Sequence, residues 1–345
     1  MLGSVKSLNR KSYIDALRII AIILVVTNHV DINYYYYHDT TNIFTFVVSL
    51  IITIICQIDV PIFFMISGAL LLKKQESIGY IWKKRIFRLF IIMLSFSIIQ
   101  YIILMVRGKI EGYGLKDFLF RFLTGNIQEP YWFLYYYIGF LILLPLLRTI
   151  AINLSDEIYI YLFVIRIILD IVLPVFFYIC NISVSVNSMM PFEFITSNLM
   201  YFLGGYYIEN RLKDDIKIFY IIVLGILSII LPFIYVLYNY VNYGTILDSN
   251  ISHITFLLTI SVFYIVKYTM KNVDNRLISK LGSCVFGIYL IESLVRMLYI
   301  GLYKYLITVT AGVVASFVYI VVTVLTSLVL VIIFKSVYIK IRALH

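Results

Sequence analysis

Apolar residues follow one another in long blocks along the chain, and short polar segments separate the blocks. Most blocks hold about 20 residues, the length an α-helix needs to cross roughly 30 Å of hydrocarbon at about 1.5 Å per residue. The pattern predicts an all-α, polytopic integral membrane protein with about ten transmembrane helices. The predicted spans are 13–33, 42–72, 86–107, 131–150, 157–180, 194–210, 217–240, 251–270, 282–302 and 306–335.

The positive charges between these blocks predict how the chain is oriented. With a cytoplasmic N-terminus, roughly 20 of the 28 Lys and Arg residues fall on inner segments, as the positive-inside rule requires. The predicted outer loops 34–41, 181–193 and 241–250 contain no Lys or Arg, and the outer loop 108–130 is the exception. An even number of spans then places both termini in the cytoplasm.

Composition agrees with this interpretation. Hydrophobic residues make up 62% of the 345 residues and charged residues only 13%, whereas a soluble domain carries about 25% charged residues. We expect one transmembrane domain over residues 1–345, with the lipid bilayer as its partner. Orientation explains the net charge of +10, so no nucleic acid is expected. The three cysteines are scattered and lack metal-ligand spacing, so no metal is expected either.

The first span carries an unusual stripe of ionisable residues. Arg18 and His29 are eleven positions apart, so at about 100° per residue they share one helix face, separated by ~16 Å along the axis. Asp15 lies close to the same face. Because charge is costly in a membrane helix, the stripe predicts either a conduit or cleft, or a structural polar contact with another helix. The first span is too long for a signal peptide and has no small-residue cleavage site, so we expect it to be an uncleaved transmembrane helix.

Glu292 lies in the ninth span, at a depth between those of Arg18 and His29. If the first and ninth helices are neighbours, its carboxylate could orient the imidazole of His29 or share a proton with it. Arg296 follows Glu292 by four positions, so a structural ion pair is the alternative. The same spacing predicts a structural pair between Arg166 and Asp170.

Three further groups of polar residues each allow two interpretations. Arg85 and Arg88, three apart at the inner end of the third span, either anchor that end or form a forked anion site. Asp59 comes just before Pro61 in the long second span, where a break in the helix would expose it to a cavity. His38 and His253 fall at the outer side and either touch a sugar or are solvated loop residues.

At these residues the chain resembles the acyltransferase 3 family of membrane proteins, which includes O-acyltransferases of bacterial surface polysaccharides. The basic residue and histidine of the first helix match Arg18 and His29. The segment VPIFFMISGALLL resembles the second-helix motif, and KKRIFRLFI resembles the Arg-x-x-Arg motif at Arg85 and Arg88. The blocks YWFLYYYIGFLILLPLLR, NLMYFLGGYYI and CVFGIYLIESL resemble later motifs, in the order that the family has them.

The resemblance implies an enzyme of the bacterial cytoplasmic membrane. Its donor would be acyl-CoA, most often acetyl-CoA, and its acceptor a hydroxyl of a glycan or lipid-linked sugar. His29 would act as general base or transient acyl carrier, with Glu292 orienting it, while Arg18, Arg85 and Arg88 would bind the phosphates of the donor.

Two positions depart from the family pattern, in which many members carry histidine where this chain has Glu292 and Pro130. Both put the acceptor or the handling of the proton in doubt. A different class of function also fits the polar stripe: a transporter or export component in which Arg18 and His29 line a substrate path and no bond is made. Turnover of acyl-CoA separates the two.

Overall fold

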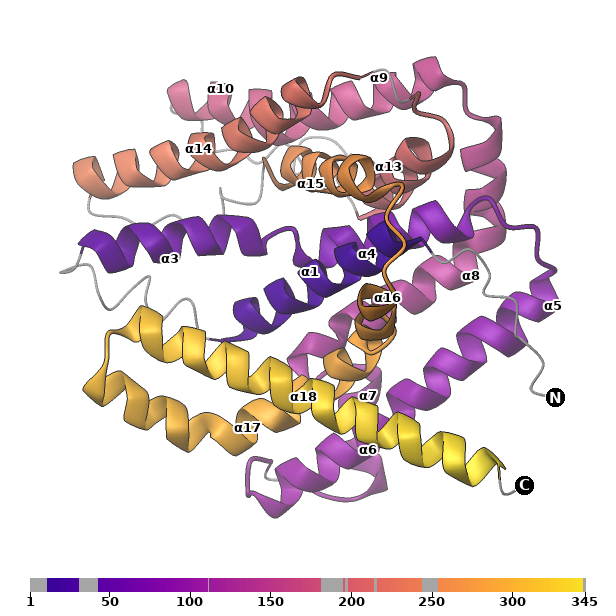
Figure 1. Cartoon of the computed structure of the whole chain (residues 1–345), viewed down its shortest axis with the longest axis vertical. Coiled ribbons are helices and arrows are strands. Elements are labelled where there is room, and N and C mark those ends of the chain that lie inside the picture. The colour runs from indigo at the N-terminus through magenta and orange to yellow at the C-terminus, as the bar shows by residue number, and fades with distance from the viewer. Residues whose placement is uncertain are drawn as a thin grey trace. The chain divides into compact units, whose positions relative to one another are not determined.

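The computed structural model describes residues 11–30, 43–110, 112–180, 195, 198–213, 216–243 and 254–343. These residues form helices and no strands, which confirms the predicted all-α class. His38, His253 and the ends of the chain lie outside the described residues. The chain divides into two compact units, residues 1–69 with 155–345 and residues 70–154, and each has its own helices (Figure 1).

The first unit is organised around helix α1, which spans Ser12–His29. The other elements of this unit are α3 (Ile43–Cys56), α4 (Asp59–Leu71), α9 (Asp156–Ile167), the π-helix η3 (Ile168–Val172), α10 (Leu173–Ile179), α13 (Leu199–Asn210), α14 (Ile218–Tyr243), α15 (Thr255–Met270), α16 (Arg276–Gly282), α17 (Val285–Val309) and α18 (Gly312–Ala343). Helix α1 contacts α3, α15, α16, α17 and α18. Leu17, Ala21 and Val26 are consequently buried completely, so α1 lies inside the unit.

The long second span is broken, as predicted. Helix α3 ends at Cys56 and α4 begins at Asp59, so Pro61 falls in the first turn of the new helix. Proline is tolerated there because the first-turn N–H groups have no partner within the helix. The Asp59 carboxylate accepts a hydrogen bond from one of those groups, the backbone N–H of Val60.

Two glycines set the distance between α4 and α13. A Cβ added to Gly68 would lie 1.8 Å from the carbonyl oxygen of Phe202, and one added to Gly205 would lie 1.9 Å from that of Met65. Because backbone atoms cannot move aside as a side chain can, the two helices require glycine at both points. This close approach of the two helices explains why the motifs FFMISG and YFLGGY contain glycine.

The second unit consists of α5 (Ile78–Tyr80), the π-helix η1 (Ile81–Ile86), α6 (Phe87–Val106), α7 (Leu115–Leu123), the 3-10 turn η2 (Glu129–Tyr131) and α8 (Trp132–Asn153). Its first helical run begins at Ile78, eight residues before the start that the sequence pattern predicts. Ser77 caps it by accepting a hydrogen bond from the N–H of Tyr80, so the polar segment before the apolar block is already helical.

Eight helical segments of the described residues are long and apolar enough to cross a membrane. The other two predicted spans correspond to the shorter helices α13 and α15, of 12 and 16 residues. Many of the outward-facing side chains are large and apolar, among them Phe87, Leu146, Phe219, Leu298 and Phe317. Such a surface fits hydrocarbon rather than water, so the chain is a multi-pass membrane protein.

Candidate functional site

His29 meets Glu292 and Arg296 where α1 ends against α17. The Nδ1 atom of His29 lies 3.0 Å from Oε1 of Glu292. Arg296 donates from Nε to Oε2 of Glu292 at 2.7 Å and from Nη1 to the backbone carbonyl of His29 at 2.6 Å. The carboxylate, which is completely buried, thus lies between an imidazole and a guanidinium. The structure brings together two of the predicted site residues from distant parts of the chain.

This arrangement determines which nitrogen of His29 is available. An ionised carboxylate only accepts hydrogen bonds, so the contact with Glu292 requires the proton of the neutral imidazole on Nδ1. Nε2 then carries the lone pair, and it has no hydrogen-bond partner among the described residues. The His29 side chain is 21% exposed. A partly exposed imidazole that contacts a buried carboxylate through Nδ1 can act as a general base or as a nucleophile.

The residue before His29 leads to a second carboxylate. Asn28 donates a hydrogen bond from Nδ2 to Oδ2 of Asp59 at 3.2 Å. Asp59 is 6% exposed and lies at the break between α3 and α4. The carboxylate of Asp59, at the break in the second span, therefore contacts the end of α1 at Asn28, the residue that precedes His29.

At the other end of α1, Arg18 donates to Asp15 at 2.7 Å. Asp15 is completely buried, whereas the Arg18 side chain is 28% exposed. A Cβ on Gly282 would lie 2.5 Å from the Cβ of Asp15, so this glycine lets α16 approach α1. The polar stripe of α1 thus faces α16 at Asp15 and α17 at His29. Arg18 keeps part of its side chain accessible beyond the ion pair.

In the second unit, Arg85 forms an ion pair with Glu76. Its Nε lies 2.8 Å from Oε2 of Glu76, and Nη2 of Arg148 lies 2.8 Å from the same oxygen. Arg148 also donates to the backbone carbonyl of Leu71 at 3.0 Å. Arg88, the other predicted member, is exposed, and no hydrogen bond joins it to another described residue. The two arginines thus have different surroundings.

The Glu76 carboxylate lies outside the membrane-spanning segments. Hydrogen bonds from Arg85 and then Arg148, together with their charges, lower the pKa of Glu76 to about 2. Arg85 belongs to the π-helix η1, a type of helix that occurs frequently at functional sites. Because Glu76 precedes this helical run and is paired with Arg85 inside it, the ion pair fixes the start of the run.

Sequence reasoning missed three of these contributors. Arg148, in helix α8, is 7% exposed, and a charge inside a predicted apolar block could have singled it out. Glu76 lies in a short polar segment with no such signal. The bond from Arg296 to the carbonyl of His29 depends on tertiary packing, so spacing along the chain could not predict it.

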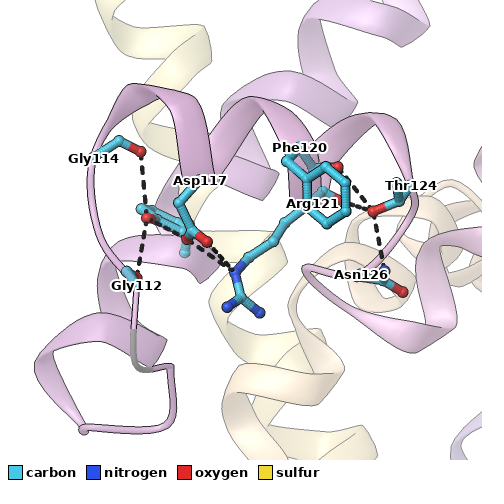
Figure 2. A network of polar contacts seen from close by, with 8 residues as sticks. Gly112, Gly114, Asp117, Phe120, Arg121, Thr124 and Asn126 are labelled. Carbon is cyan, nitrogen blue, oxygen red and sulfur yellow. Dashed lines mark hydrogen bonds and ion pairs between the residues drawn. The ribbon is translucent and has the colours of Figure 1, made fainter.

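The segment between α6 and α8, the exception to the charge rule, is partly neutralised. Asp117 accepts hydrogen bonds from the Tyr101 hydroxyl at 2.8 Å and from Nε of Arg121 at 2.9 Å. Figure 2 shows this network beside the carbonyls of Gly112 and Gly114. The hydrogen bond from Tyr101, followed by that from Arg121, lowers the pKa of Asp117. Helix α7 is thereby attached to α6.

The pair Arg166–Asp170 is present as an ion pair across the start of η3. Arg166 also donates to the carbonyl of Ile195 at 2.7 Å and lies over the rings of Tyr201 and Phe256. These contacts fit the structural reading that the four-residue spacing favours. Among the described residues, no group of three or more His, Cys, Asp or Glu side chains could hold a metal ion.

Comparison with known proteins gives one match. The model of the acyltransferase 3 family, described as an acyltransferase domain, matches residues 11–332. No curated protein and no solved structure matches the chain. The matched range includes the His29–Glu292–Arg296 cluster and all six motifs that resemble the family. The chain therefore belongs to the acyltransferase 3 family of membrane acyltransferases.

Proposed function

We propose that the protein transfers an acyl group, acetyl in the first instance, from acyl-CoA to a hydroxyl of a cell-envelope glycan or its lipid-linked precursor. The reaction takes place in the bacterial cytoplasmic membrane. The observation that supports this proposal most is the contact between Nδ1 of His29 and the buried carboxylate of Glu292, in a chain that belongs to an acyltransferase family.

In the proposed reaction His29 is the general base. Its Nε2 accepts the proton of the acceptor hydroxyl while the hydroxyl oxygen attacks the thioester carbonyl carbon. The tetrahedral intermediate then collapses, the C–S bond breaks, and the CoA sulfur leaves with the proton that the imidazolium returns. The products are an ester and free CoA. Glu292 holds the Nδ1 tautomer and stabilises the imidazolium while it exists.

The phosphates of the donor need cationic partners near the cytoplasmic face. In the first unit Arg18 is the proposed contact, because its side chain is 28% exposed although it is paired with Asp15. A distance of ~16 Å along α1 separates it from His29, which is of the order of the extended pantetheine arm. In the second unit, Arg88 is exposed and Arg85 is bound to Glu76. We therefore assign donor binding there to Arg88, with Arg85 positioning the helix that carries it.

The experiment uses membranes that contain the full chain, with radiolabelled acetyl-CoA and envelope glycan fractions as acceptor. Incorporation of label into glycan, matched by release of free CoA and absent from membranes without the protein, supports acyl transfer. Succinyl-CoA and longer acyl-CoA are tested in parallel. If none of these donors is consumed while the purified protein moves glycan across vesicle membranes, the chain is a transporter and the proposal is wrong.

A further inference from the structure

An apolar pocket lies between α1, α3 and α18 in the first unit, with a volume of about 430 Å³. Its wall is formed by Ile23 and Thr27 of α1, Ile52 and Ile55 of α3, and Phe317 and Val321 of α18, with neighbouring residues of the same helices. The proposed chemistry at His29 uses none of these side chains.

The length of the pocket matches one leaflet of a bilayer. Along α18 its lining runs from Val313 to Leu325, which corresponds to ~18 Å at about 1.5 Å per residue. Half of the hydrocarbon core measures ~15 Å. Since α18 begins on the side where α1 ends, the pocket occupies the half of the membrane that the positive-inside rule assigns to the outer leaflet.

The pocket opens sideways toward lipid. Phe317, Val321 and Leu325 follow one another at four-residue spacing on α18, and their exposed fractions are 67%, 37% and 56%. Ile23, on the facing helix, is 41% exposed. A crevice that is apolar, as long as a leaflet and open to hydrocarbon has the dimensions of one lipid chain. A polar solute has no partner there except at its edges.

The outer end of the pocket reaches the level of His29. Val30, which follows His29, packs against Ala315 and Tyr319 of α18, and Ser316 lines the pocket between them. Thr27 and His29 point about 200° apart around α1. A lipid chain in the pocket therefore lies on the face of α1 opposite to His29. Its head group leaves the pocket where α1 ends.

One buried hydroxyl in the pocket points to a ligand with oxygen atoms. The Oγ of Ser49 is buried and has no hydrogen-bond partner among the described residues, and Ser49 lines the pocket. A buried hydroxyl without a hydrogen-bond partner is unfavourable, because it has lost its contacts with water and gained none in the protein. The first oxygen atoms of a lipid head group could accept a hydrogen bond from this hydroxyl, whereas a pure hydrocarbon could not.

We propose that this α1–α3–α18 pocket binds the hydrocarbon chain of the lipid that carries the acceptor hydroxyl, and so brings a lipid-linked sugar to His29. The inference rests on the proposed acyl transfer and specifies its acceptor as membrane-bound. The lipid chain provides affinity through burial of apolar surface, and the head group carries the reacting hydroxyl around the end of α1.

Photocrosslinking tests occupancy independently of activity. The probe is a polyprenyl-phosphate-linked sugar with a diazirine in its tail, added to membranes that contain the full chain. We expect adducts on peptides that contain Ile52 and on those with Phe317 or Val321. Unlabelled polyprenyl-phosphate sugar should remove them, and phosphatidylglycerol at equal concentration should not. Equal competition by phosphatidylglycerol, or adducts only elsewhere, would overturn the inference.

Two variants fill the pocket, Ile52→Trp from the inner wall and Val321→Trp from the rim, so that one remains informative if the other does not fold. The matched control is Val329→Trp, on the same helix but outside the lining, where the side chain is 54% exposed. We expect adduct yield to fall at least ~5-fold and KM for the lipid-linked acceptor to rise at least ~5-fold in the filled variants, and a 5-fold change corresponds to about 1 kcal/mol of binding free energy. The control should match the wild type.

The two proposals fail in different ways. If crosslinking follows this pattern but no acyl group is transferred to any acceptor, the pocket binds the lipid and the proposed function is wrong. If acyl transfer proceeds with the same acceptor KM in both filled variants, the proposed function stands and the inference about the pocket is wrong.

Discussion

Arg296 joins the two partners of the candidate site by donating to the backbone carbonyl of His29 and to the carboxylate of Glu292. His29 and Glu292 are 263 positions apart in the sequence, and their side chains meet at 3.0 Å. One guanidinium therefore fixes the end of α1 and the carboxylate on α17 at the same time. His29 is therefore held in place both through its backbone carbonyl and through its imidazole ring.

Glu292→Gln should remove most of the activity while leaving the fold in place. Glutamine keeps the size of the side chain but not the charge that favours the Nδ1–H tautomer and stabilises the imidazolium. We expect kcat to fall ~10²-fold or more, within the range of ~10²–10⁴ for general acid–base catalysis, with little change in KM for either substrate. Steady-state kinetics in membranes measures both constants.

The matched control for Glu292→Gln is Glu157→Gln, at an exposed position in the first turn of α9. It should retain wild-type kinetics. Unchanged kcat in Glu292→Gln would mean that Glu292 is only the structural partner of Arg296. Loss of the monodisperse, detergent-solubilised protein would instead mean that the buried charge of Arg296 needs its carboxylate to fold.

Acyl transfer should decline on the acid side of its pH profile. The groups around the His29 ring are Glu292 and Arg296 from α17 and Asp59 from α4. The base must be neutral at the start of the reaction, because a protonated imidazole cannot accept the proton of the acceptor hydroxyl. The rate of labelled acetyl transfer, measured between about pH 5 and 8, checks this expectation. A flat profile over that interval argues against His29 as base.

The ion-pair cluster of the second unit should make stability sensitive to acid. The pKa of Glu76 is lowered to about 2 by Arg85 and Arg148, compared with about 4.3 for an unperturbed glutamate. A lowered pKa contributes stability that is fully present above the unfolded value and is lost as pH falls from about 4.3 toward 2. Glu76→Gln should be less stable at pH 7 and should lack this loss. Thermal unfolding in detergent at pH 7, 4.5 and 3 measures both effects, and equal acid sensitivity of the two proteins would contradict the assignment.

Arg85 and Arg88 should separate into a structural and a donor-binding residue. Arg85→Gln leaves Glu76 with one arginine and should lower the unfolding temperature, whereas Arg88→Gln should not. Under the proposed function, Arg88→Gln raises KM for acetyl-CoA because a cationic contact with its phosphates is lost. Paired measurements of unfolding temperature and of KM for acetyl-CoA test this division. The reverse pattern would assign the donor contact to Arg85.

Alanine at Gly68 or Gly205 should destabilise the contact between α4 and α13. Each new Cβ would lie within 2 Å of a backbone carbonyl oxygen, so the cost should exceed the ~1–3 kcal/mol typical of overpacking. Gly301→Ala is the control, since its Cβ would meet nothing within 4 Å. Reduced yield and unfolding temperature in the first two variants, and wild-type behaviour in the third, are expected. Wild-type stability of Gly205→Ala would contradict the close approach.

The apolar blocks predicted the fold class because helices in hydrocarbon must satisfy their own hydrogen bonds. The break near Pro61 was predictable for a local reason, since proline cannot continue an established helix. The ends of helices were less predictable. The third span begins at Ile78 because Ser77 caps it, and hydropathy does not register a cap or a polar first turn.

The candidate site was predictable only in part. The spacing of Arg18 and His29 placed both on one face, because a helix repeats at about 100° per residue. Which helix that face meets depends on packing: α16 approaches Asp15 only where Gly282 leaves room. The ion pair between Arg85 and Glu76 was not predictable either, because it depends on how the polar segment before the helix folds back and not on a local sequence pattern.

The most direct test of acyl transfer at His29 compares the wild type with His29→Ala and with Leu298→Ala, a control at an outward-facing position of α17 that is 65% exposed. Membranes with equal amounts of each protein receive labelled acetyl-CoA and envelope glycan fractions. We expect label in the glycan with the wild type and with Leu298→Ala, and loss of label with His29→Ala, while all three proteins unfold at similar temperatures. Full incorporation of label by a folded His29→Ala protein would contradict it.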